Sequence, residues 1–379
     1  MIEITENNKT LQGYKFIDLF AGIGGFHYSL KSYGANCVFA SELDKKASET
    51  YELNHRLKPF GDITKINANE IPKHDILCGG FPCQAFSISG KQKGFEDTRG
   101  TLFFDIARII EYHKPKVLLL ENVKNFVKHD KGNTIKTIIK ILEELNYQVN
   151  YKVLNTSKFG LPQNRERVYL VCFNLDFYDA PSFNFPNLKL RSKLQDILEK
   201  EPLDAKIVER DDISFYKDYQ IKTDLFGNQE LPNKPIQIGK VNKGGQGERI
   251  YHIQGHSITL SAYGGGVGSK TGLYKINNKI RKLSPRECAR LQGFPETFIY
   301  PNSISQAQKQ FGNSVSINVL QYIIQEITQT IKENEQRTEI GFKNSKKRIQ
   351  KRKRYCREVQ QLEKRQNSTE LVDANGIQS

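Results

Sequence analysis

The 379-residue sequence has no tryptophan, a single methionine and no uninterrupted apolar run of 18 residues. A helix needs about 20 consecutive apolar residues to cross a bilayer, so the composition predicts no membrane span. No secretory signal is recognisable either, and we therefore expect a cytoplasmic protein that does not act at a membrane. The missing tryptophan indicates nothing about function.

The cysteines form no pattern typical of a metal site. They are Cys37, Cys78, Cys83, Cys172, Cys288 and Cys356, and they include no C-x-x-C pair and no histidine at metal-ligand spacing. Zinc sites require such spacing, so we expect no metal. Scattered thiols in a chain of this size are typical of reduced, cytosolic proteins.

The formal charge of +15 is concentrated near the end of the sequence. Between Lys343 and Arg365 there are eleven lysines and arginines and two glutamates, so this segment alone carries +9. An excess of positive charge favours a polyanionic partner, although it does not establish one. We predict that residues 334–379 are a mobile, nonspecific electrostatic arm.

Apolar strands alternate with amphipathic helices up to about residue 176, which predicts an α/β fold with a mostly parallel sheet and helices on both faces. The following residues, 177–281, are rich in glycine, proline and charge, and predict a smaller, loop-rich domain. Helical patterns return from Ser284, which with Pro285 and Glu287 has the form of a helix start. We expect residues 282–333 to return to the first domain, with a last helix over Ser314–Lys332.

Cys83 stands in GGFPCQAFS, residues 79–87, directly after the apolar run Ile76–Cys78. It therefore lies just past a predicted strand end, where open α/β sheets bind their ligands. An ordinary buried cysteine is the alternative, but the proline and glycine context favours a nucleophile. The polar, glycine-punctuated residues 87–100 could close over an anionic substrate.

Three further features follow predicted strands and favour a nucleotide-like ligand. FIDLFAGIGGF, residues 16–26, is a strand, a glycine-rich turn and a helix start, although its spacing differs from the G-x-G-x-x-G of dehydrogenases. Glu42 ends the second strand, where a carboxylate can bind both hydroxyls of a ribose. Asp62 could accept a hydrogen bond from an adenine amino group. Either acid alone would more often be a solvated surface charge.

Charged residues also flank two later strands. Glu121 follows the apolar strand Val117–Leu120, so its carboxylate should face the same crevice as Cys83, with a helix-cap role as the alternative. Arg165 and Arg167 precede a strand, and alternation would place both on one side. Such a pair can hold a carboxylate, a phosphate or a base carbonyl, or form surface ion pairs.

Taken in order, these motifs closely resemble the cytosine-5 DNA methyltransferases. The resemblance is carried by FIDLFAGIGGF, GGFPCQAFS, Glu121-Asn122-Val123, QNRERVYL (163–170), RKLSPRECARLQGFP (281–295) and KQFGNSVSINVL (309–320). It implies the S-adenosylmethionine-dependent methyltransferase fold, a Rossmann-like mixed sheet with helices on both faces, and a smaller, loop-rich target-recognition domain.

The resemblance also implies roles for the catalytic residues. Cys83 matches the thiolate that adds to C6 of cytosine, and Glu121 matches the acid at N3. Arg167 matches the residue at O2, and Arg165 its support near the nucleophile. A base inside a duplex cannot reach Cys83, so the cytosine must be flipped out. Residues 87–100 resemble the loop that closes over it, with Ser87 and Arg99 as DNA contacts.

Residues for the cofactor S-adenosylmethionine follow from the same resemblance. Phe20, Gly22 and Gly24 would lie by its methionine part, Glu42 by the ribose and Asp62 by the adenine. Asn313, in the last motif, would close the same pocket.

Two glycine-rich strings, which we call the target loops, resemble those of the GCGC-specific members of the family. They are GGQGERIY, residues 244–251, and TLSAYGGG, residues 259–266. By this likeness Arg249 reads a guanine edge, Gln246 fills the gap left by the flipped cytosine, and Thr259 and Tyr263 hold phosphates. We expect a monomer acting on double-stranded DNA in a bacterial cytoplasm, with a cognate restriction endonuclease acting at the same site.

Three other classes of protein fit the sequence less well. An RNA cytosine-5 methyltransferase is disfavoured by a separate domain with two groove-sized loops. A non-catalytic DNA-binding protein would not need Cys83, Glu121, Arg165 and Arg167 together. A dehydrogenase lacks both the usual glycine spacing and an evident hydride-transfer pair.

Overall fold

The computed structural model describes residues 9–82, 102–216 and 233–337. Residues 1–328 belong to one compact unit, and a second unit, residues 329–379, is described only to residue 337. Within the described ranges, no helix combines the length and the apolar composition that a bilayer span requires.

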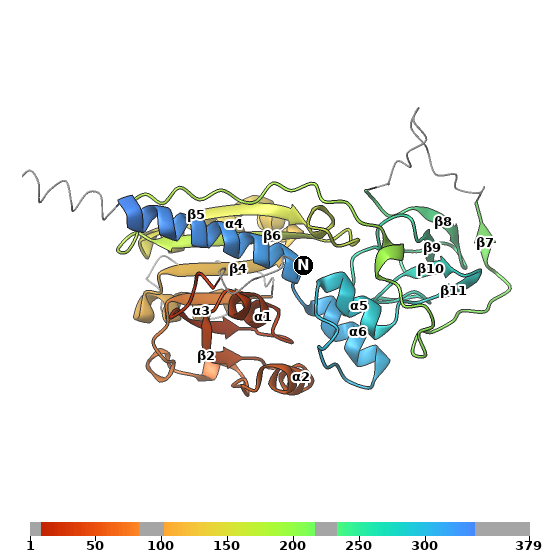
Figure 1. Cartoon of the computed structure of the whole chain (residues 1–379), viewed down its shortest axis with the longest axis horizontal. Helices are drawn as coiled ribbons and strands as arrows, with labels where there is room; N and C mark the ends of the chain where they lie inside the picture. Colours follow the sequence, from red (N-terminus) through yellow and green to blue (C-terminus); the bar gives the residue numbers. More distant parts are fainter. Residues whose placement is uncertain (1–8, 83–101, 217–232, 338–379) are drawn as a thin grey trace, which may run out of the picture. The chain divides into compact units, whose positions relative to one another are not determined.

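A six-stranded mixed sheet forms the centre of the first part of the chain (Figure 1). Its strand order is β2-β1-β3-β4-β6-β5. The strands β1, β2, β3 and β4 are parallel to one another, whereas β6 is antiparallel to both β4 and β5. The bounds are β1 Lys15–Leu19, β2 Asn36–Ser41, β3 Ile76–Gly80, β4 Val117–Val123, β5 Tyr147–Asn155 and β6 Glu166–Asn174.

Helices cover both faces of this sheet because its strands are apolar on both sides. Ile17 and Leu19 of β1 pack into the core formed with α3 and α4. Phe16, which alternation directs to the opposite face, contacts His27 of α1 edge to face at 5.5 Å between ring centroids. The helices are α1 Gly25–Ser32, α2 Lys45–His55, α3 Leu102–His113 and α4 Asn133–Glu144. This arrangement is the predicted methyltransferase-type α/β fold.

A second sheet of five short strands lies in residues 214–281, with the order β11-β10-β9-β8-β7. Its small core includes Val241, Ile250 and Leu273. Between residues 177 and 281, the described helical structure is limited to the 3-10 turn Leu194–Ile197, as the loop-rich composition predicts. The strands are β7 Ser214–Phe215, β8 Gln237–Lys240, β9 Arg249–His252, β10 Leu273–Ile276 and β11 Lys279–Arg281.

The helices α5 Pro285–Gln292 and α6 Ile304–Asn313 lie between the two sheets (Figure 1). Ser284 and Glu287 cap α5 reciprocally, as predicted. Helix α6 was not predicted from the sequence, and the last helix was predicted over about Ser314–Lys332. Residues 304–313 form a separate helix capped by Ser303, whereas the predicted last helix is present and spans residues 317–337 in the described part of the chain.

The start of that last helix contacts the first part of the chain. The hydroxyl of Tyr33, which follows α1, donates to the carbonyl of Gln321 at 2.8 Å. Asn318 donates to the carbonyl of Phe159 at 3.1 Å. Residues 317–328 therefore return to the elements that the chain forms first.

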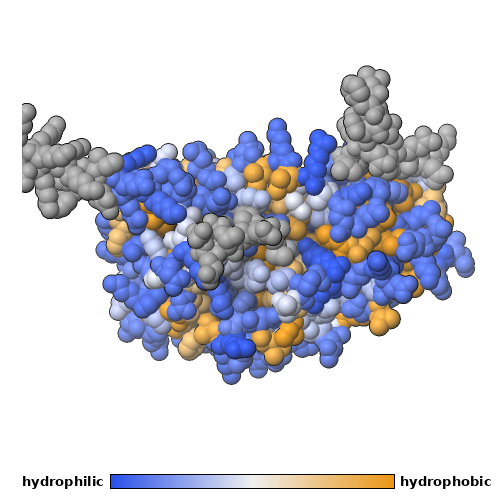
Figure 2. Space-filling view, viewed as in Figure 1, coloured by the Kyte–Doolittle hydropathy of each residue, from blue (hydrophilic) through white to orange (hydrophobic). Residues whose placement is uncertain are grey.

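Short 3-10 segments complete the described structure: Ile63–Lys65, Ala68–Glu70, Lys124–Gly132 and Thr156–Lys158. The surface seen in Figure 2 is mainly hydrophilic, with small, separate apolar patches. Patches of this kind are normal on a protein surface.

Candidate active site

The carboxyl ends of the parallel strands β1, β2, β3 and β4 border one cavity of about 420 Å³. This is the edge of an open α/β sheet at which ligands bind. Eight of the predicted site residues line the cavity: Phe20, Gly22, Glu42, Asp62, Glu121, Arg165, Arg167 and Asn313. They are separated by up to 293 positions in the sequence.

The turn after β1 is held in left-handed backbone conformations. Phe20 has a φ of 54°, which is strained for a bulky residue and is found mainly at functional sites. Gly24 has a φ of 86° and caps α1. A side chain at Gly24 would collide with His55, since a Cβ there would lie 2.1 Å from its Nε2. Gly24 is thus packed against His55 and is not part of the cavity wall.

Glu42 follows β2 and fixes the turn through its carboxylate. One oxygen accepts from the backbone N–H of Gly22 and the other from that of Asp44, each at 2.7 Å. Burial raises the pKa of Glu42, while these two hydrogen bonds oppose the shift. Each carboxylate oxygen can accept a second hydrogen bond, so Glu42 can also bind a pair of ligand hydroxyls.

Asp62 caps the short helix Ile63–Lys65 at the rim of the cavity. Its carboxylate accepts hydrogen bonds from the hydroxyl and the backbone N–H of Thr64, and these lower its pKa. The carboxylate is therefore held in one orientation and in its charged form, as an acceptor for a ligand amino group requires.

Glu121 and Arg167 form a largely buried ion pair across adjacent strands. The Nε of Arg167 lies 3.1 Å from Oε1 of Glu121. Oε1 of Glu121 makes no hydrogen bond within the described structure, so the Nε–H of Arg167 is not directed at it. Burial raises the pKa of Glu121, and Arg167 and Arg165 oppose the shift. A raised pKa favours the protonated form of the carboxyl group, which can donate a hydrogen bond to a ligand atom in the cavity.

Arg165 is only 2% exposed and is fixed by backbone carbonyls. Its two terminal nitrogens donate to Leu260 at 3.0 Å, Gly312 at 3.2 Å and Ser314 at 2.6 Å. Burial lowers its pKa to about 9. Because β6 begins at Glu166, strand alternation does not govern Arg165; both arginines line the cavity but they hold different groups.

Gln163, in the same motif, connects the residues before β6 to the second target loop and to α5. It is fully buried, accepts from the backbone N–H of Leu260 and donates to the carbonyl of Leu291, each at 3.0 Å. The backbone of Asn164 also pairs with that of Ser257. The residues that lead into β6 therefore hold the start of the second target loop.

The predicted DNA contacts lie in the target loops, outside the cavity wall. Gln246 and Arg249 are exposed, and Arg249 donates to the carbonyl of Gly244 at 3.4 Å. Tyr263 is 74% exposed. Thr259 is half-buried and its hydroxyl donates to the carbonyl of Asn164, which leaves this hydroxyl only as an acceptor.

Three predicted residues, Cys83, Ser87 and Arg99, lie outside the described residues. Pro82, which precedes Cys83 in the sequence, lines the cavity. Among the described residues, no group of three or more histidine, cysteine, aspartate or glutamate side chains could hold a metal.

Several residues of the cavity wall were not predicted from the sequence. They include Leu43, Asp44, Ile63, Asn122, Lys309 and Gln310. Asn122 donates to the carbonyl of Phe81 at 2.9 Å and so ties β4 to the segment that precedes Cys83. Asn122, Lys309 and Gln310 stand in motifs that carry the family resemblance. Their position in these motifs could have indicated that they line the cavity.

The fold and this cavity together define a methyltransferase of the α/β class. Residues 14–329 match the model of the C-5 cytosine-specific DNA methylases, and the chain belongs to that family. It is therefore a DNA cytosine-5 methyltransferase. Methyltransferases generally take the methyl group from S-adenosylmethionine, and DNA is the substrate of this family. The family assignment disfavours the RNA-modifying, non-catalytic and dehydrogenase alternatives.

Similar proteins include type II methyltransferases of known name. The chain is 53% identical over 328 residues to M.HhaI of Haemophilus parahaemolyticus, covering 85% of this chain and 96% of that protein. It is 42% identical to M.HpaII of Haemophilus parainfluenzae, covering 85% and 91%. A similar fold occurs in a putative DNA modification methyltransferase encoded within an E. coli prophage, with a TM-score of 0.60, 21% identity and coverage of 84% and 100%.

Proposed function

We propose that the chain methylates the first cytosine within a GCGC-containing site, with S-adenosylmethionine as donor and Cys83 as nucleophile. The observation that carries the proposal is the Glu121–Arg167 pair, 3.1 Å apart, which lines the same cavity as Glu42. A proton-holding carboxyl group and a fixed guanidinium are the groups needed on the N3 and O2 side of a cytosine.

The cavity residues fit S-adenosylmethionine. A volume of about 420 Å³ lies in the range of small-molecule sites. Glu42 retains acceptor capacity for the ribose hydroxyls, Asp62 is an oriented acceptor for the adenine amino group, and Phe20 and Gly22 border the remaining space. Gly24 supports this turn, and Asn313 closes the wall from α6. When bound, the cofactor supplies an electrophilic methyl group.

The side chains activate a cytosine that is otherwise a poor carbon nucleophile. The thiolate of Cys83 forms a bond to C6, and the electron pair of the C5–C6 double bond moves into the ring. Glu121 stabilises that charge by holding a proton at N3, while Arg167 faces O2 and Arg165 fixes the surrounding backbone. C5 would take the methyl group of the bound cofactor, which is left as S-adenosylhomocysteine. Transfer of the C5 proton to water then re-forms the C5–C6 double bond and expels Cys83 as the thiolate.

The proposed division of the chain into two domains is consistent with binding of a flipped base. Residues 1–176 and 282–333 would form the catalytic domain, and residues 177–281 the target-recognition domain. The exposed side chains of Arg249 and Tyr263 suit contacts with a guanine edge and with a phosphate. Ser87 and Arg99 would complete the DNA contacts. One base and one cavity need a single copy of the chain.

Protection of DNA from a cognate restriction endonuclease in a bacterial cytoplasm follows from this reaction. Methylation at a short, fixed sequence marks every copy of that sequence. A nuclease that reads the same bases in the major groove would meet the new methyl group there.

The proposed function is tested by identifying the methylated product and by assaying a Cys83 variant. Purified protein, a GCGC-containing duplex and donor with a labelled methyl group should yield labelled 5-methyl-2′-deoxycytidine after digestion to nucleosides. Cys83→Ser should abolish turnover and retain duplex binding, while Cys356→Ser, which removes a thiol from the basic tail, should keep both. Turnover of Cys83→Ser within about tenfold of the wild type would disprove the nucleophile assignment.

A further inference from the structure

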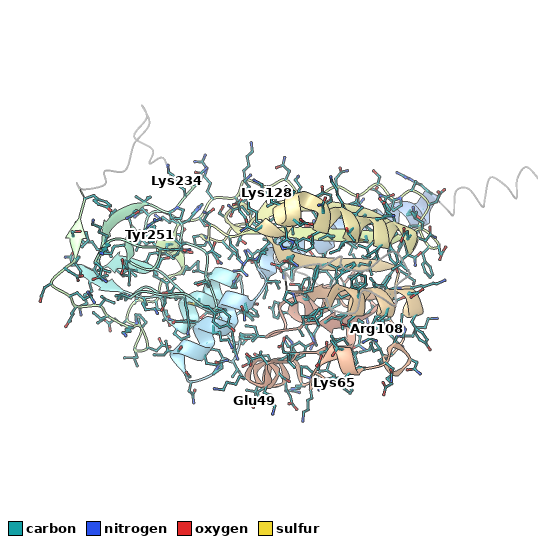
Figure 3. The ribbon with its side chains drawn as sticks, turned by 180° about the vertical axis from the view of Figure 1, so that it is seen from behind. Glu49, Lys65, Arg108, Lys128, Lys234 and Tyr251 are labelled. Atoms are coloured by element: carbon teal, nitrogen blue, oxygen red, sulfur yellow. The ribbon has the colours of Figure 1, made fainter. Side chains whose placement is uncertain are left out.

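Helix α6 joins the cofactor side of the cavity to the target loops. On one side it is bonded to α2: the Thr50 hydroxyl donates to Oε1 of Gln310 at 3.0 Å, and Nε2 of Gln310 donates to the carbonyl of Lys46 at 2.9 Å. In Figure 3, α2, marked by Glu49, lies beside the α5–α6 pair, and the sheet that carries Tyr251 lies on the other side of that pair.

On its other side, α6 packs directly on the second target loop. Gly312 allows this approach, since a Cβ there would lie 2.4 Å from the carbonyl carbon of Ser261. Beyond that loop, the ammonium of Lys270 donates to the carbonyl of Ser305 at 2.9 Å. The helix therefore contacts the loop region at both its ends, and any shift of one must be accommodated by the other.

Lys309 is the residue of α6 that contacts both sides. Its ammonium lies 2.9 Å from Oδ2 of Asp44 and 5.7 Å from the ring centre of Tyr263. Asp44 caps α2, and its backbone N–H donates to Oε1 of Glu42. A continuous series of contacts thus runs from the carboxylate at the cofactor cavity, through Asp44 and Lys309, to an exposed tyrosine of the second target loop.

We propose that Lys309 is a positioning residue that couples cofactor binding to DNA binding. The inference rests on the proposed roles of Glu42 at the ribose and of Tyr263 at a phosphate. A ribose bound to Glu42 fixes the Asp44 turn and so the ammonium of Lys309, which in turn orders Tyr263 for the DNA. By linkage, DNA held by Tyr263 strengthens cofactor binding by the same factor.

The coupling can be measured without turnover. The affinity of the full chain for S-adenosylhomocysteine is determined by titration calorimetry, alone and with a saturating GCGC duplex. The variants are Lys309→Met, which keeps the stem, Asp44→Asn, which keeps an N-cap residue, and the double variant. Lys45→Met is the matched control, since it removes an exposed lysine next to Asp44 without breaking the ion pair.

In the wild type and in Lys45→Met, DNA should tighten S-adenosylhomocysteine binding about fivefold or more. In both single variants the ratio of S-adenosylhomocysteine affinities with and without DNA should fall to within about twofold of one. The double variant should lose no more of this coupling than either single variant. The loss of affinity in Lys309→Met should be larger with DNA than without it, because the lysine acts through Asp44 and Tyr263.

Two results would overturn the inference: an unchanged coupling factor in Lys309→Met, or an equal loss of affinity with and without DNA, which would make Lys309 a plain cofactor contact. A wild type that methylates DNA but shows no coupling would also overturn it and leave the proposed function intact. Conversely, coupling that is lost in Lys309→Met, in a protein that does not methylate GCGC, would refute the proposed function and support this inference.

Discussion

Replacing Gln163 by leucine should destabilise the protein more than most single substitutions. The side chain has no exposed surface and accepts from Leu260 and donates to Leu291, each at 3.0 Å. Leucine preserves the approximate volume but leaves the backbone N–H of Leu260 and the carbonyl of Leu291 unpaired. The carbonyl belongs to the last turn of α5, where no intrahelical donor follows, and both partner residues are at most 1% exposed.

The magnitude follows from counting the orphaned groups. An unsatisfied buried donor or acceptor costs about 1–3 kcal/mol, so the two together should cost roughly 2–6 kcal/mol. For a chain of this size, about 2 °C of Tm is lost per kcal/mol, which predicts a fall of roughly 4–12 °C.

Differential scanning calorimetry of matched variants measures this loss. Gln308→Leu is the control: Gln308 is equally buried but makes one such bond, from Nε2 to the carbonyl of Leu283 at 2.8 Å, and should lose about half as much. A Gln163→Leu variant that melts within about 2 °C of the wild type would refute the reasoning, because it would mean that water or a rearranged backbone satisfies both groups.

Three other outcomes are expected. Burial lowers the pKa of His27 to about 2 and of His55 to about 4, below the usual 6.5, so the unfolded chain binds more protons at these residues on acidification. Each histidine should therefore contribute a loss of about 2 kcal/mol of stability between pH 7 and pH 5. His55→Gln should remove the contribution of His55, and an equal pH-dependent loss in the variant and the wild type would contradict the argument. Deleting residues 338–379 should weaken DNA binding at all sequences alike and flatten the slope of log affinity against log salt, and an unchanged slope would show that the tail does not touch DNA. Methylation of duplexes that differ from GCGC at one base pair measures the next two variants. Arg249→Ala should lose about 1–3 kcal/mol of discrimination at one guanine, and unaltered discrimination would show that Arg249 does not contact a base. Gln246→Ala should lower the methylation rate more than the discrimination between sites.

Local sequence signals predicted the elements whose structure is set by neighbouring residues. The glycine turn after β1, the carboxylate Glu42 at the end of β2 and the capping box of Ser284 and Glu287 each depend on a few adjacent positions. In α4, Ile135, Ile138 and Leu142 recur at helical spacing, and the structure buries them together with Ile141.

The remainder depends on contacts between distant parts of the chain. Nothing near Lys309 in the sequence indicates a partner 265 positions away at Asp44. Helix α6 was missed because its residues 304–313 are mainly polar and small, and its buried side chains include Gln308 and Gln310. Arg165 was expected to precede a strand, as it does, but the three carbonyls that bind it are brought together only by the folded chain.

The covalent step assigned to Cys83 can be trapped with a GCGC duplex in which the target cytosine carries fluorine at C5. Fluorine cannot leave as a cation, so the final elimination is blocked once the methyl group is attached and the C6–sulfur bond persists. Incubation with S-adenosylmethionine should give a stable complex of one chain and one duplex, and mass spectrometry of its peptides should locate the nucleotide on Cys83 with the additional methyl group. A duplex that remains unattached while ordinary GCGC is methylated, or an adduct on any other cysteine, would contradict the account.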